Sequence, residues 1–305
     1  MRPLGTNLIL ESERIWFPGA QGARTDHSRE EQPEPMDAAV LALLALIFVI
    51  AVLYSSVGLA GGSGYLAAMA LVGMGPEAMK PTALCLNIVV ALIATVRFAR
   101  AGCFSWRLFW PFVLGSVPFS FIGGALALPS PVYKGFVGVL LLFAAAMLIR
   151  KSEEGGEHSE SPVPGRAESL LPDRAAPPLH DRATARLAVP TGLAIGGVIG
   201  LISGMIGIGG GIFLSPIVLL RGWAGARESS GLVAPFILVN SIAALAGHYL
   251  ATGSIPAPAP LWAAAASVGG VIGAGLGSRK LSPVAIRRIL ALVLLIAAMK
   301  LIATM

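Results

Sequence analysis

The sequence predicts an all-α polytopic membrane protein made of two inverted repeats, with about eight full transmembrane helices and two short, glycine-broken helical arms. Its 305 residues are 55% hydrophobic and 12% charged, and the mean hydropathy is +0.79, values typical of membrane rather than soluble proteins. All of the 16 carboxylates except Glu77 and Glu228 lie within 1–37 and 153–181. A cluster of glycines interrupts a long uncharged run in each half of the chain.

Four regions follow from this composition. Residues 1–36 are polar and acidic, and we interpret them as a disordered tail or as a mis-assigned start upstream of Met36. A first membrane repeat is expected over 37–151 and a second over 187–305. Between them, 152–186 is rich in Pro, Glu, Ser, Arg and Gly, a composition that predicts a disordered cytoplasmic linker.

Spanning helices need ~20 apolar residues each, and eight segments meet that need. They are 38–57, 82–99, 107–128, 132–150, 187–206, 230–250, 259–278 and 284–303. The two halves resemble each other at a spacing of about 150 residues, most plainly in 139–147 and 292–299 and in the pairs Asn87 with Asn240 and Pro131 with Pro283. A repeat of this length fits duplicated transporter halves rather than a solenoid.

The short arms 64–76 and 211–220 decide the topology. Five crossings per half with the N-terminus outside place eleven Lys and Arg residues in the cytoplasm and only Lys80, Lys134 and Lys300 outside. Four crossings per half divide the same residues eight to six, so the positive-inside rule favours five. An odd number also makes the halves inverted. Whether each arm crosses fully or re-enters is left open.

The glycine clusters are the candidate substrate site. Bare backbone is tolerated inside a bilayer only where protein or a water-filled cavity satisfies it. Each short arm begins just after its cluster, so helix N-termini and free N–H groups point at the break and suit an anion. The candidate residues are Gly61, Gly62, Ser63 and Gly64 in the first half and Gly207, Gly209, Gly210 and Gly211 in the second. The alternative is close helix packing, which we assign to the looser pairs at 196–200 and 269–273.

Asn87 and Asn240 are polar residues in otherwise apolar segments, so they are expected to face the bundle interior. They either donate to a substrate oxyanion or hold helices together. Glu77 and Glu228 are interpreted as helix N-terminal caps, and His248 as an interfacial residue or a proton carrier. We expect no lysine or arginine inside the membrane.

Enzyme classes are disfavoured. Gly61-Gly62-Ser63-Gly64 matches the string of rhomboid intramembrane proteases, but the sole candidate base, His248, lies in the other half of the chain. Cys85 and Cys103 form neither a disulfide framework nor a metal set, and no metal, nucleotide or other cofactor motif is present. The basic balance reflects membrane topology, so nucleic acid is not an expected partner.

The segment from Gly204 to Pro216 resembles the hallmark of the sulfite exporter TauE/SafE family, and the segment from Ser56 to Leu66 resembles its weaker partner. The resemblance covers almost everything from residue 38 onward apart from the linker. It implies a multi-pass inner-membrane transporter, an exporter of small sulfur-containing anions such as sulfite or organosulfonates. The physical expectation is alternating access around an anion site at the midplane, within the lipid bilayer. The competing interpretation is an anion channel; the exact anion, proton or ion coupling, and the oligomeric state are left open.

Overall fold

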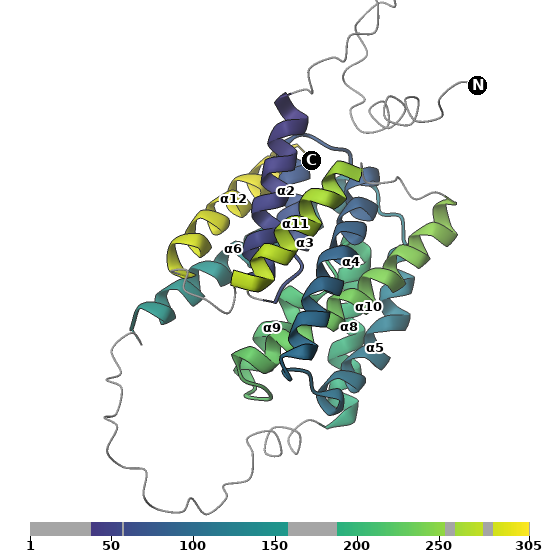
Figure 1. Ribbon diagram of the computed structural model, residues 1–305. Helices are drawn as coiled ribbons and strands as arrows, with labels where there is room; N and C mark the ends of the chain where they lie inside the picture. Colours follow the sequence, from purple (N-terminus) through teal and green to yellow (C-terminus); the bar gives the residue numbers. More distant parts are fainter. Residues whose placement is uncertain (1–37, 57, 158–187, 254–259, 277–282, 305) are drawn as a thin grey trace, which may run out of the picture.

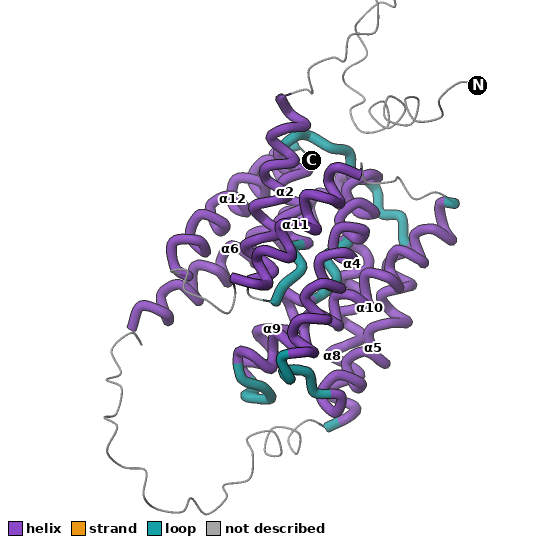
Figure 2. Tube along the Cα trace, viewed as in Figure 1, coloured by secondary structure: helices purple, strands orange, loops and turns teal. Residues whose placement is uncertain are grey.

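The computed structural model describes residues 38–56, 58–157, 188–253, 260–276 and 283–304, and every regular element in these ranges is an α-helix (Figures 1 and 2). The predicted N-terminal tail and most of the predicted linker lie outside the described residues. The helices are α2 (Ala38–Ser56), α3 (Gly62–Leu71), α4 (Pro76–Arg100), α5 (Trp106–Ala125), α6 (Ser130–Glu157), α8 (Val189–Ile206), α9 (Gly211–Leu220), α10 (Ala226–Thr252), α11 (Pro260–Leu276) and α12 (Pro283–Ala303).

The helical character predicted from the sequence is confirmed. Among the described residues, five segments are long and apolar enough to cross a membrane: Pro76–Arg100, Trp106–Ala125, Ser130–Met147, Val189–Ile206 and Glu228–Thr252. Shorter apolar helices complete the bundle, including both glycine-broken arms, Gly62–Leu71 and Gly211–Leu220. The chain is therefore a multi-pass membrane protein.

Some boundaries differ from the prediction. The first arm ends at Leu71 rather than near 76, and α4 begins at Pro76 rather than at 82. Proline is well suited to the first helical position because the amide hydrogen it lacks has no partner there. At the other end of the first repeat, α6 continues to Glu157, six residues past the predicted boundary at 151.

Helices from the two halves are interleaved. Helix α8 packs along α5, whereas α2 packs along α11, so each half contributes the first helix to a pair completed by the other. Helices α6 and α12 also lie against each other, and so do α4 and α10. In Figure 1 the purple α2 and the yellow-green α11 lie side by side, although they come from opposite ends of the sequence.

Glycines allow the close α5–α8 contact. A Cβ on Gly196, Gly200 or Gly204 would overlap the carbonyl oxygen of Phe112, Ser116 or Ser120 on α5, respectively. On α11, a Cβ at Gly273 would overlap the carbonyl oxygen of Val52 on α2. The packing role predicted for the glycines at 196–200 and 269–273 is thus confirmed.

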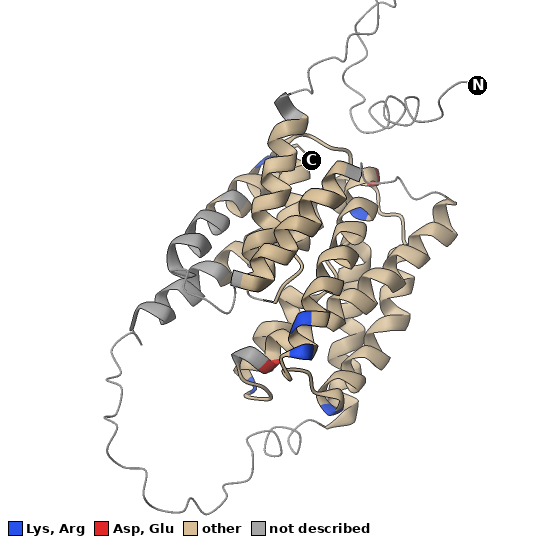
Figure 3. Ribbon diagram, in the orientation of Figure 1, with Lys and Arg blue, Asp and Glu red and all other residues tan. Residues whose placement is uncertain are grey.

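The outer surface suits a bilayer. Large apolar side chains stay exposed on many helices, among them Leu114, Val139, Val198 and Leu292, as expected where the solvent is lipid. Figure 3 shows lysine, arginine and the acidic residues of the described chain near the ends of the bundle. At one such end the Gly225 N–H donates to the Glu228 carboxylate at 3.2 Å, which confirms the predicted cap.

Candidate functional site

Both predicted breaks are present, and both have the same local geometry. Gly61 and Gly210 are the N-caps of α3 and α9, with φ of +99° and +81°. This left-handed conformation is strained for residues with a Cβ and accessible to glycine. Each cluster therefore turns the chain sharply and starts a ten-residue helix at the break. The two arms then run toward opposite ends of the bundle (Figure 1).

The two breaks meet. A Cβ on Gly62, the first residue of α3, would lie 2.7 Å from the carbonyl oxygen of Ile208 in the second break. The same Cβ would lie 2.7 Å from Asn87 Nδ2, which itself donates to the Gly207 carbonyl oxygen at 3.4 Å. Gly62, Asn87, Gly207 and Ile208 are all buried. The structure thus brings the glycine clusters of both halves together beside Asn87.

Each break also touches the long helix of the opposite half. A Cβ on Gly58 would lie 2.5 Å from Ser230 Cβ near the start of α10, and one on Gly207 would lie 3.0 Å from the Lys80 carbonyl oxygen near the start of α4. The contacts are reciprocal because Lys80 and Ser230 occupy equivalent places, four residues after Pro76 and Ala226. Each half therefore braces the other's break.

The remaining predicted residues surround this junction. Gly64 faces Ile50 and Tyr54 of α2, and Ser63 Oγ forms a 2.9 Å hydrogen bond with the Tyr54 hydroxyl. A Cβ on Gly209 would lie 2.6 Å from Ile237 Cγ2, and one on Gly211 would overlap the Ile237 side chain. The Ser63 hydroxyl is thus paired with a tyrosine rather than presented to a base as a nucleophile.

Asn240 lies in a different setting from Asn87. Its Nδ2 donates to the Phe236 carbonyl oxygen in its own helix at 2.9 Å, and its backbone carbonyl oxygen accepts from the Ser120 hydroxyl on α5. Asn87 lies eleven residues after the start of α4, and the residue eleven after the start of α10 is Ile237, which faces Gly211. Counted from the helix starts, Asn240 lies three residues beyond the position that corresponds to Asn87, and the pairing of the two asparagines stays a prediction.

Three of the buried polar atoms that lack a hydrogen-bond partner lie at the breaks, and one of the side chains that carry them, Tyr65, was not singled out from the sequence. The Tyr65 hydroxyl and Ser241 Oγ, like Asn87 Oδ1, are buried without a hydrogen-bond partner among the described residues. Tyr65 faces Gly61, and Ser241 Oγ would lie 2.8 Å from a Cβ on Gly209. A buried polar group without a partner is costly, so these hydroxyls are suited to a polar ligand at the junction. The sequence alone does not show that the hydroxyls of Tyr65 and Ser241 lie next to the breaks.

Lys80 was expected to lie before a spanning segment that starts at 82, but it is buried inside α4. It is 6% exposed, and it is the only buried charged side chain in the described part of the chain. Its ammonium donates to the carbonyl oxygens of Gly123, Gly124 and Leu126 at the C-terminal end of α5. Pro76 was the signal for an earlier helix start, which places Lys80 inside α4 rather than outside it.

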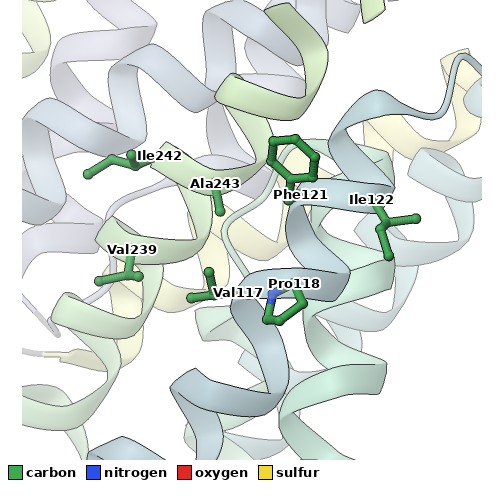
Figure 4. Close-up of a pocket in the computed structure, with 7 residues that line it drawn as sticks. All are labelled: Val117, Pro118, Phe121, Ile122, Val239, Ile242 and Ala243. Atoms are coloured by element: carbon green, nitrogen blue, oxygen red, sulfur yellow. The ribbon is translucent and has the colours of Figure 1, made fainter. Parts of the chain in front are cut away.

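A groove of about 540 Å³ lies between α5 and α10, away from the breaks. Figure 4 shows its lining by Val117, Pro118, Phe121, Ile122, Val239, Ile242 and Ala243. All seven side chains are apolar, and four of them are exposed. The groove therefore has the character of a lipid-facing surface rather than of an anion site.

Comparison with known proteins gives two sequence matches. The sequence model of a family described as "Sulfite exporter TauE/SafE" matches residues 43–301. The chain is 38% identical over 267 residues to "Probable membrane transporter protein y4hK" of Sinorhizobium fredii (strain NBRC 101917 / NGR234), across 88% of this chain and 100% of the relative. No solved structure matches.

Proposed function

This chain belongs to the sulfite exporter TauE/SafE family, and from that premise we propose that it exports small sulfur-containing anions such as sulfite or organosulfonates. The proposed site is the junction of the two glycine breaks. The proposed cycle is alternating access in the inner membrane, with the N-terminus outside and the linker in the cytoplasm.

One observation carries the proposal: the N-termini of α3 and α9 begin at glycines that meet across the two halves, with Gly62 against Ile208. Helix N-termini carry partial positive charge and free N–H groups, which favour anions without a charged side chain. The unpaired hydroxyls of Tyr65 and Ser241 add donors at the same place. A small anion held in this way can leave again, as transport requires.

Reciprocal packing supports an inverted repeat of five crossings per half. The contacts of Gly58 with Ser230 and of Gly207 with Lys80 are equivalent under exchange of the halves. Transporters with inverted repeats move substrate by rocking one part against another around a fixed midplane site. The membrane potential favours outward movement of an anion by ~2.3 kcal/mol per charge per 100 mV.

The test replaces Gly210, whose added Cβ would approach Ile199, Phe236 and Ser203. Gly210→Val is expected to abolish sulfite flux in proteoliposomes while the protein still inserts. The matched control is Gly73→Val, because Gly73 has a similar φ of +82° but nothing within 4 Å of its Cβ position. Ser63→Ala is expected to reduce sulfite flux only slightly.

Substrate class is tested separately on the purified wild-type protein. Sulfite and sulfoacetate are expected to raise its melting temperature more than chloride does at equal ionic strength, because ligands of the native state stabilise it. Normal sulfite flux through Gly210→Val would refute the proposed site. Current that does not saturate with sulfite concentration would instead indicate a channel.

A further inference from the structure

The charge of Lys80 is unusual for its position. Its side chain is buried in α4, and the three hydrogen bonds of its ammonium all go to carbonyl oxygens rather than to carboxylates. A buried charge in a membrane protein is costly and commonly marks an ion or substrate pathway. A helix C-terminus carries roughly half a negative charge, so the end of α5 offsets only part of the positive charge of Lys80.

The location of Lys80 connects it to the glycine breaks. Its Cα and Cγ would each lie 3.3 Å from a Cβ on Gly207, so α4 carries this residue directly against the second break. The ammonium then reaches the end of α5 and Leu126, the residue that follows it. Lys80 therefore lies between the junction and the end of the bundle where α4 begins and α5 finishes.

One of the three ammonium contacts is suited to exchange. Gly123 and Gly124 belong to the last turn of α5, and their contacts with Lys80 are buried. Leu126 lies beyond that helix in extended backbone, is exposed, and accepts from Lys80 at 3.1 Å in a partly buried contact. An anion arriving on this side can replace the Leu126 carbonyl oxygen and leave the two helix contacts in place.

We propose that Lys80 forms a second anion station, at the end of the pathway next to the start of α4, where a small oxyanion binds after it leaves the glycine breaks. The inference rests on the proposed transport function and extends it to a residue with a positive charge.

The equivalent place in the second half supplies a contrast. Ser230 packs against Gly58 as Lys80 packs against Gly207, yet serine carries no charge. Bracing a glycine break therefore does not require an ammonium group. The charge of Lys80 therefore serves the proposed anion station, which has no counterpart at Ser230.

The experiment measures saturable sulfite flux in proteoliposomes from the side that Lys80 faces. Lys80→Gln is expected to raise the KM for sulfite about tenfold, whereas Lys80→Arg, which keeps the charge, is expected to stay near the wild-type value. The control is Lys300→Gln. Lys300 also donates to a helix-end carbonyl, that of Leu71, but in an exposed contact, so its loss is expected to leave the KM unchanged.

A wild-type measurement keeps the test decisive if Lys80→Gln fails to insert. Sulfite is expected to slow acetylation of Lys80 several-fold, as read by mass spectrometry, without slowing that of Lys300. A Lys80→Gln protein with an unchanged KM, or an acetylation rate of Lys80 insensitive to sulfite, would overturn the second station. If the wild-type protein carries no sulfur anion at all, the proposed function itself fails.

Discussion

At the residue scale, Asn87 links the two halves at the junction. It is fully buried in α4, and its amide reaches the Gly207 carbonyl oxygen in the opposite half. Helix α8 has just ended there, so that carbonyl lacks the usual helical donor. Tyr133 plays a similar part by donating to the Ile206 carbonyl oxygen at 2.9 Å. Side chains of the first half thus stabilise the broken helix end of the second.

Asn87→Ala is expected to lower the free energy of unfolding by ~1–3 kcal/mol, because it leaves a buried carbonyl oxygen unsatisfied, and to reduce sulfite flux. Asn240→Ala is the matched control. The acceptor of Asn240 is Phe236 of the same helix, so we expect a smaller loss. Unfolding in detergent measures the free energy of unfolding of both variants. Equal decreases for Asn87→Ala and Asn240→Ala would show that the hydrogen bond between the halves contributes little to stability.

How far the sequence predicts this site depends on the kind of residue. The glycine clusters are evident because they interrupt long uncharged runs, and both were found at helix starts. The neighbours across the halves depend on tertiary packing, so Ile208 against Gly62 could not be inferred. Lys80 was placed before a helix expected to start at 82, whereas α4 begins at Pro76. The different partners of Asn87 and Asn240 also depend on tertiary packing, so the matched sequence positions could not predict them.

At the element scale, α5 and α8 pack backbone against backbone along their length. Glycines at every fourth position of α8 bring its backbone against that of α5, which is the usual way in which membrane helices associate without a hydrophobic driving force. Each of the eight spans expected from hydropathy coincides with a helix, and five segments of the described chain are long and apolar enough to cross a membrane. Their interleaved partners are not recognisable from hydropathy, because every helix has a similar apolar composition.

Gly200→Ala is expected to destabilise the protein by ~1–3 kcal/mol, the usual cost of overpacking, because the new methyl group would overlap the Ser116 backbone. Gly197→Ala, in the same helix, is the control. Its methyl group would meet the Phe119 ring at 3.3 Å, and a side chain can adjust where backbone cannot. Thermal unfolding of the two variants compares them, and equal melting temperatures would contradict the close backbone contact.

At the scale of the whole molecule, the proposed inverted repeat makes a prediction about the two ends of the bundle. The loops that follow α3 and α9 contain Gly73 and Gly222, both with positive φ and with nothing within 4 Å of the Cβ position. Under five crossings per half, the first loop lies outside and the second lies in the cytoplasm.

The measurement uses Gly73→Cys and Gly222→Cys in a protein whose Cys85 and Cys103 are replaced by alanine. A membrane-impermeant maleimide is expected to label Gly73→Cys in intact cells and Gly222→Cys in inside-out vesicles. The two cysteines face similar surroundings and similar backbone strain, so reactivity reports the side of the membrane. Labelling of both from one side would contradict the inverted arrangement.

The exchange of lysine for serine between equivalent places has an energetic consequence for the resting protein. In a duplicated carrier with identical inverted halves, exchanging the halves converts the outward-open form into the inward-open form, so the two forms have equal free energy. Here one half holds a fixed cation and the other a neutral hydroxyl. Under the proposed alternating access, this difference predicts that the empty protein favours one orientation over the other.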